Sequence, residues 1–114
     1  VSGKIKIKEK AYQTALREIK EETGIVPLKL WVVPNVNSFY SHHTDELNFI
    51  PVFAGLVDDS SEVKLSDEHS EFKWVRLEEA KELLAWKGQK NSVDIIYEYF
   101  TNNLSILNFT HIDF

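Results

Sequence analysis

Residues 3–25 read GKIKIKEKAYQTALREIKEETGI, and this stretch decides how the rest of the chain is interpreted. From Glu9 to Thr23 the apolar residues recur at the spacing of one helix face. That face is formed by Tyr12, Ala15, Leu16 and Ile19. Gly24 follows as a C-terminal cap, and Pro27 lies just beyond it. The pattern therefore predicts a helix over residues 9–23.

The opposite face of this helix carries three glutamates. At 100° per residue, Glu22 lies about 40° to one side of Glu18, and Glu21 lies about 60° to the other. Like charges at these spacings destabilise a helix. A hard divalent cation offsets the repulsion, because Mg²⁺ prefers carboxylate and phosphate oxygens. The face therefore predicts a Mg²⁺ site, with Mn²⁺ as a substitute, that deprotonates or positions a water. The alternative is a solvated acidic face with Arg17 and Lys20 as ion-pair partners.

The spacing of the fixed residues is more specific than an acidic helix. The fixed positions are Gly3, Glu9, Arg17, Glu18, Glu21, Glu22 and Gly24, with aliphatic residues at Ile19 and Ile25. At roughly 5–7% usage for each residue type, seven such coincidences have a chance of about 10⁻⁸ per starting position. The stretch resembles the Nudix box at every fixed position.

This resemblance to the Nudix hydrolases implies a loop, a helix and a second loop that bind a metal ion and a pyrophosphate. It implies that the three glutamates are metal ligands or the base that activates water, without assigning a single base. Arg17 resembles the residue that orients a catalytic glutamate through a salt bridge. We therefore take Glu18, Glu21 and Arg17 as the catalytic candidates, and Glu18, Glu21 and Glu22 as metal ligands.

The remaining fixed positions have roles that the resemblance implies for the loop itself. Glu9 is expected to tether the loop, and Gly24 belongs with it to the structural part of the box. Gly3 is expected to let the backbone approach the metal or the phosphates, as glycine can. Lys4 is the candidate for a phosphate contact; the alternative is that the four lysines of this loop are solvated.

Three later segments, residues 37–40, 50–54 and 68–75, resemble the nucleoside triphosphate or dATP pyrophosphohydrolase branch more weakly. The resemblance implies that Glu68 adds a carboxylate to the metals, with Glu71 as the alternative. His69 is a substrate-contact candidate because it borders Glu68. Phe39 and Tyr40 are candidates for stacking on a base; the alternative is packing within a sheet.

Composition bounds these interpretations. The 114 residues suit one domain, 1–114, and contain no cysteine, which excludes disulfides and thiolate metal sites and is consistent with a cytoplasmic protein. A net charge of −5 argues against binding a nucleic-acid polymer but permits an anionic small nucleotide beside a metal ion. No apolar stretch approaches a membrane span, so no membrane association is expected. Because the chain begins at Val1 and the family usually has three strands before the box, we expect N-terminal strands to precede it.

The fold expected is the Nudix-type α/β/α sandwich, an α/β class with a mixed β-sheet between helices. Residues 1–8 are either a strand or a loop. Strands are predicted at Leu28–Val33, closed by Pro34-Asn35, and at Ser38–His42, Leu47–Val57, Glu62–Leu65 and Glu71–Arg76. Helices are predicted at Leu77–Trp86 and Ser92–Asn102, and an edge strand within Ile106–Phe114.

The expected activity is Mg²⁺-dependent cleavage of a pyrophosphate bond, by attack of water, in a (deoxy)nucleoside triphosphate. The products would be a nucleoside monophosphate and pyrophosphate. Two alternatives remain open. The substrate is a nucleoside diphosphate sugar or a dinucleoside polyphosphate, since the box fixes the chemistry and not the leaving group, or the domain senses a ligand without turnover. Family analogy suggests a homodimer.

Overall fold

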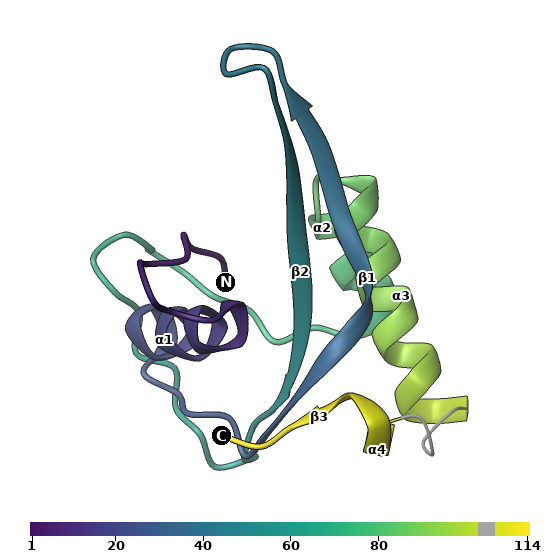
Figure 1. The fold of residues 1–114 in the computed structure, drawn as a ribbon. Coiled ribbons are helices and arrows are strands. Elements are labelled where there is room, and N and C mark those ends of the chain that lie inside the picture. The colour runs from purple at the N-terminus through teal and green to yellow at the C-terminus, as the bar shows by residue number, and fades with distance from the viewer. Residues whose placement is uncertain (103–106) are drawn as a thin grey trace. The chain divides into compact units, whose positions relative to one another are not determined.

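The computed structural model describes residues 1–102 and 107–114, which divide into two compact units. The first unit consists of Val1–Leu30 and Gly55–Trp74, and the second of Trp31–Ala54 and Val75–Phe114. The described elements include both helices and strands (Figure 1), so the α/β class expected from the sequence is confirmed. None of the helices in the described part of the chain is both long and apolar enough to cross a membrane.

The first unit is built on helix α1, Ala11–Thr23, which matches the helix predicted over residues 9–23. At its start, the Gln13 side chain accepts a hydrogen bond from the backbone N–H of Lys10 (2.8 Å). At its end, Gly24 takes the left-handed conformation (φ 74°) and donates its N–H to the Lys20 carbonyl (2.9 Å). Only a residue without Cβ adopts this conformation freely, which is why the helix ends at a glycine.

Apart from the ends of two strands, at residues 29–30 and 55–56, the rest of the first unit is irregular chain. Residues 1–8 form a loop, not a strand, with Lys8 in the left-handed region (φ 68°). The strand predicted at Glu62–Leu65 is wrong, because the N–H of Lys64 is used to cap the helix carbonyl of Thr23 (2.8 Å). The strand predicted at Glu71–Arg76 is also wrong: the segment has no strand pairing. Its large apolar residues, Phe72 and Trp74, are exposed.

Most of the described three-stranded sheet, in the order β2-β1-β3, belongs to the second unit, whereas residues 29–30 of β1 and 55–56 of β2 belong to the first. The strands are β1, Lys29–Ser41; β2, Glu46–Leu56; and β3, His111–Ile112. β1 and β2 form a long hairpin (Figure 1) whose turn ends at Asp45, another left-handed residue (φ 53°). β2 matches the predicted Leu47–Val57.

The prediction that Pro34-Asn35 closes a strand is wrong, since β1 runs unbroken through both residues. Proline is tolerated in a strand where its missing N–H would not have joined a ladder. The described β3 is only two residues long, so within the described residues most of β1 has no strand partner on that side. Because β1 is continuous, the strands predicted separately at Leu28–Val33 and Ser38–His42 are parts of a single strand.

Three helices complete the second unit: α2, Leu77–Leu83; α3, Lys87–Asn102; and α4, Leu107–Thr110. α2 packs against α3. α2 ends three residues before the predicted Trp86, because Leu84 is already extended (φ −74°, ψ 134°). α3 begins at Lys87, earlier than the predicted Ser92. Of the predicted edge strand in Ile106–Phe114, only β3 is a strand, and residue 106 lies outside the described residues.

Polar and aromatic contacts fix α3 against β1. Asn35 donates its Nδ2 to the hydroxyl of the buried Ser92 (2.9 Å), which in turn donates to the Gly88 carbonyl (2.9 Å). A Cβ at Gly88 would lie 2.7 Å from the Asn37 side-chain oxygen, so a larger residue would have to move that side chain. Farther along, Trp31 and Phe100 pack edge to face with ring centroids 4.8 Å apart.

Candidate functional site

Arg17 is the centre of a hydrogen-bond network in the first unit. Its Nε donates to Glu9 Oε2 (2.9 Å) and its Nη2 to Glu9 Oε1 (3.1 Å), a two-pronged ion pair. Its Nη2 also donates to the Lys4 carbonyl (3.0 Å). Its Nη1 contacts the carboxylates of Glu18 and Glu21. One guanidinium therefore joins the loop before α1 to two glutamates on the helix.

Glu9 is held by more than Arg17. Its Oε1 also accepts from the hydroxyl of Thr14 (2.6 Å) and the backbone N–H of Lys6 (3.1 Å). These donors favour the ionised carboxylate and lower the pKa of Glu9 from 4.5 to about 2, with the Arg17 hydrogen bond as the largest cause. The same hydrogen bond to Glu9 is the main cause that raises the pKa of Arg17. Both groups are charged at neutral pH.

Gly3 allows Glu18 to lie against the loop backbone. A Cβ built at Gly3 would fall 2.2 Å from the Cδ of Glu18 and 2.3 Å from its Oε1, closer than real atoms approach. The Glu18 side chain is also largely covered, at 15% exposure. Any larger residue at position 3 would therefore displace this carboxylate.

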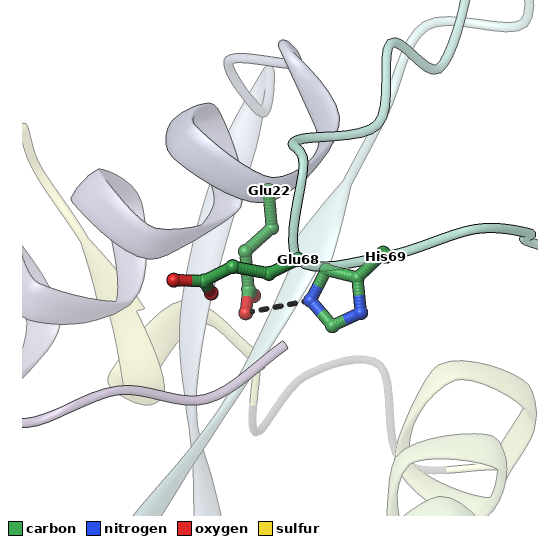
Figure 2. A group of neighbouring side chains, drawn as sticks. All are labelled: Glu22, Glu68 and His69. Carbon is green, nitrogen blue, oxygen red and sulfur yellow. Dashed lines mark hydrogen bonds and ion pairs between the residues drawn. The ribbon is translucent and has the colours of Figure 1, made fainter.

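Glu22 points toward the loop that carries Glu68 and His69 (Figure 2). Its Oε1 lies 3.1 Å from His69 Nε2. One ligand atom from each of Glu22, Glu68 and His69 lies within 4.8 Å of the others. Glu22 is buried, whereas Glu68 and His69 are exposed, so the group has a buried anchor and an open side.

The donor set fits a divalent cation. Among the described residues, the second carboxylate oxygen of Glu22 is buried and has no hydrogen-bond partner. A buried carboxylate oxygen is normally satisfied, since leaving it unpaired is costly. A cation would satisfy this oxygen, and carboxylates are the ligands that Mg²⁺ and Mn²⁺ prefer. Glu22 and Glu68 are therefore the residues best placed to hold an ion in this group.

The structure thus brings together most of the residues that the sequence singled out in this unit. Glu9, Gly3, Glu18 and Glu21 meet around Arg17, and Glu68 meets Glu22. Glu21 is the most open of the box glutamates, with 54% of its side chain exposed. Glu68, preferred over Glu71, belongs to the possible metal-binding group, and Glu71 does not. The roles assigned to all these residues remain predictions.

The proposed substrate contacts are distributed differently. Lys4 is exposed, and its backbone carbonyl accepts a hydrogen bond from Arg17. His69 lies at the carboxylate of Glu22. Phe39 and Tyr40 belong to the second unit, where Tyr40 donates its hydroxyl to Asp45 (2.7 Å). That hydrogen bond raises the pKa of Tyr40.

The sequence reasoning missed Thr14. It is buried at 5% exposure, and its hydroxyl donates to Glu9 and to the Lys10 carbonyl (3.3 Å). Position 14 is variable in the box pattern, so spacing gave no signal for it. Its place in the first turns of α1, five residues after Glu9, is the only hint that the sequence offers.

Comparison with known proteins identifies the family of the chain. The model of the NUDIX domain family matches residues 1–96. The chain therefore belongs to the NUDIX domain family, as the box predicted. Nudix proteins generally use divalent cations, which agrees with the acidic group at Glu22. The comparisons do not specify the dATP-type branch.

Two relatives carry the same name. The asymmetrical bis(5'-nucleosyl)-tetraphosphatase of Mus musculus is 32% identical over 84 residues, which cover 72% of this chain and 57% of that protein. Its counterpart from Sus scrofa is 32% identical over 90 residues, 77% of this chain and 61% of that protein. The chain thus spans about three-fifths of the length of these curated relatives.

A solved structure shows the same fold. The crystal structure of a C. elegans Ap4A hydrolase binary complex superposes with a TM-score of 0.70 at 21% identity. The match covers 86% of this chain and 72% of the other. The α/β fold expected for a Nudix protein is therefore confirmed.

Proposed function

We propose that this protein hydrolyses a dinucleoside polyphosphate, cutting it asymmetrically with the help of a divalent cation. The observation that carries the proposal is the gathering of the box carboxylates around Arg17, with Glu22 turned toward Glu68 and His69. The names of the relatives support this substrate class. It is the alternative that the sequence left open beside a nucleoside triphosphate.

The reaction is a substitution at phosphorus. The oxygen of a water molecule forms a bond to one phosphorus, and the bond from that phosphorus to its bridging oxygen breaks. The electron pair leaves with the bridging oxygen on the departing nucleotide, and a proton of the water passes to a glutamate carboxylate. For a dinucleoside tetraphosphate cut asymmetrically, the products are a nucleoside triphosphate and a nucleoside monophosphate.

The residues of the site have separate tasks in this proposal. Glu22 and Glu68, with Glu21, would hold the cation, which would neutralise charge on the phosphates and lower the pKa of a bound water. Glu18 is fixed between Arg17 and Gly3, which suits a carboxylate that must accept a proton at a defined place. Arg17 orients Glu18 and binds the loop through Glu9.

The test is product identification on the full-length protein with Mg²⁺ or Mn²⁺. The substrates are diadenosine tetraphosphate, the nucleoside triphosphates, ADP-ribose and a nucleoside diphosphate sugar. We expect ATP and AMP in equal amounts from diadenosine tetraphosphate, with ¹⁸O from labelled water in one of the two. Two equivalents of ADP, or preferential release of pyrophosphate from a triphosphate, would overturn the proposed substrate class.

Two variants connect the reaction to the site. Glu18→Gln and Glu22→Gln keep the size of each side chain but remove its charge. We expect both to lose at least about a hundredfold in kcat, as a missing general base or electrostatic group does. Glu98→Gln, on the exposed surface of α3, is the matched control and should retain full activity. Unchanged turnover in the first two variants would show that the metal helix is misassigned.

A further inference from the structure

His69 completes the group of possible metal ligands around Glu22. Its Nε2 faces Glu22 Oε1 at 3.1 Å, and Glu68 comes from the adjacent position on the same loop. All three residues belong to the first unit. In Figure 2 the imidazole and the two carboxylates converge from α1 and from this loop.

The carboxylate of Glu22 provides an independent sign of a ligand here. Glu22 is 9% exposed, and within the described residues its Oε2 is buried without a hydrogen-bond partner. An acidic group on the surface would be solvated and would need no ion. A buried carboxylate oxygen in this group instead lacks a positive partner, which a cation would supply.

The spacing of Nε2 and Oε1 is compatible with direct coordination of one ion. Two ligand atoms, each roughly 2.1 Å from a metal and at right angles to each other, are about 3.0 Å apart. The 3.1 Å between His69 Nε2 and Glu22 Oε1 is close to this value. The same distance also fits a hydrogen bond, so distance alone does not separate the two arrangements.

We propose that His69 is a direct ligand, through Nε2, of the cation held by Glu22 and Glu68. A nitrogen ligand changes which ion the site prefers. Mg²⁺ demands oxygen ligands and has little affinity for imidazole, whereas first-row transition ions accept both donors. The site is therefore selective for an ion such as Mn²⁺ over Mg²⁺. This inference rests on the proposed cation-dependent function, because it names the ligand set of the same site.

The test is pulsed electron paramagnetic resonance of Mn²⁺ bound to the full-length protein without nucleotide. Protein labelled with ¹⁵N only at histidine should show a ¹⁵N hyperfine coupling to the bound Mn²⁺. His69→Gln, which keeps a donor that can reach Glu22, should abolish that coupling. The control His43→Gln, on the exposed hairpin turn, should retain it. Bound Mn²⁺ without nitrogen coupling in the unmodified sequence, or no Mn²⁺ binding, would overturn the proposal.

Affinities provide the second readout. We expect His69→Gln to weaken Mn²⁺ binding at least about tenfold, the scale on which even indirect partners of a metal site act. Mg²⁺ binding should change much less, so the preference for Mn²⁺ should shrink. If His69 only orients Glu22 by a hydrogen bond, both affinities should fall together or stay unchanged.

The outcome is separable from that of the proposed function. Nitrogen coupling in a protein that leaves diadenosine tetraphosphate intact would support the ligand and reject the substrate. Hydrolysis of diadenosine tetraphosphate without nitrogen coupling would support the substrate and reject the ligand.

Discussion

Arg17 donates two parallel hydrogen bonds to Glu9, from Nε to Oε2 (2.9 Å) and from Nη2 to Oε1 (3.1 Å). This fork is available to a guanidinium and not to an ammonium group. Because the same guanidinium also reaches Glu18, the loop and the helix are positioned by one side chain.

Arg17→Lys should therefore reduce catalysis without unfolding the protein. A lysine keeps the charge but loses the fork, so Glu18 and the loop are held less firmly. We expect kcat to fall roughly 10–100-fold at saturating metal, the size of effect typical of residues that orient a metal site. Steady-state kinetics on diadenosine tetraphosphate measures it. Arg76→Lys is the matched control, because Arg76 is an exposed arginine before α2, and it should leave kcat unchanged.

The ion pair should also make the protein sensitive to acid. The pKa of Glu9 falls from 4.5 to about 2 on folding, chiefly because of Arg17. A lowered folded-state pKa contributes stability that is present above the unfolded value and lost as pH falls toward the folded one. Thermal unfolding should thus show Glu9→Gln less stable than the parent at pH 7, with the two curves converging between pH 4.5 and about 2. A constant difference across that range would exclude this role.

The part of the site that lies on one helix was predictable from the sequence. Glu18, Glu21 and Glu22 occur at helical spacing, and Gly24 ends the helix where a left-handed residue is required. Thr14 was not predictable, because its role depends on a hydrogen bond from its hydroxyl to Glu9, which residue spacing does not reveal.

The irregular chain was the harder part. The loop with Glu68 and His69 has no periodicity, and its path depends on turns and on the Lys64 N–H that caps α1. β-Branched and alternating residues in that loop suggested strands, but strands need a partner whose edge the sequence does not specify. For the same reason the prediction that Pro34 ends a strand was wrong. Whether a proline costs a hydrogen bond depends on the neighbour on that side.

Gly3→Ala should affect activity more than stability. The new Cβ would overlap the end of the Glu18 side chain, which is flexible enough to move aside. Displacing that carboxylate should lower kcat at least about tenfold, as the loss of a positioned base does, while the melting temperature changes little. Gly55→Ala is the control, because its Cβ would meet Pro27 at an ordinary 3.4 Å. Full activity in Gly3→Ala would show that Glu18 need not occupy this place.

Gly24→Ala should, conversely, affect stability more than activity. At φ 74° an alanine is strained, and we expect about 1–2 kcal/mol of lost stability, the usual penalty for a left-handed L-residue. Gly24→Asn should lose less, since asparagine tolerates this conformation. Urea unfolding of the three proteins gives the order glycine, asparagine, alanine. Equal stability for alanine and asparagine would mean that the left-handed φ is not the cause.

Removing the metal should reveal the free-energy cost of burying the Glu22 carboxylate. Without a cation, its buried Oε2 has no partner among the described residues, and Glu18 and Glu21 lie on the same helix face. Glu22→Gln relieves the buried charge, so the chelator-treated variant should melt above the chelator-treated parent. Added Mn²⁺ should then stabilise the parent, by about 2.7 kcal/mol at a hundredfold excess over Kd, and leave the variant unmoved. Glu98→Gln, on the exposed surface of α3, is the control and should keep the metal response. A chelated Glu22→Gln less stable than the parent would mean that the Glu22 carboxylate is already satisfied, and that His69 and not an ion is its partner.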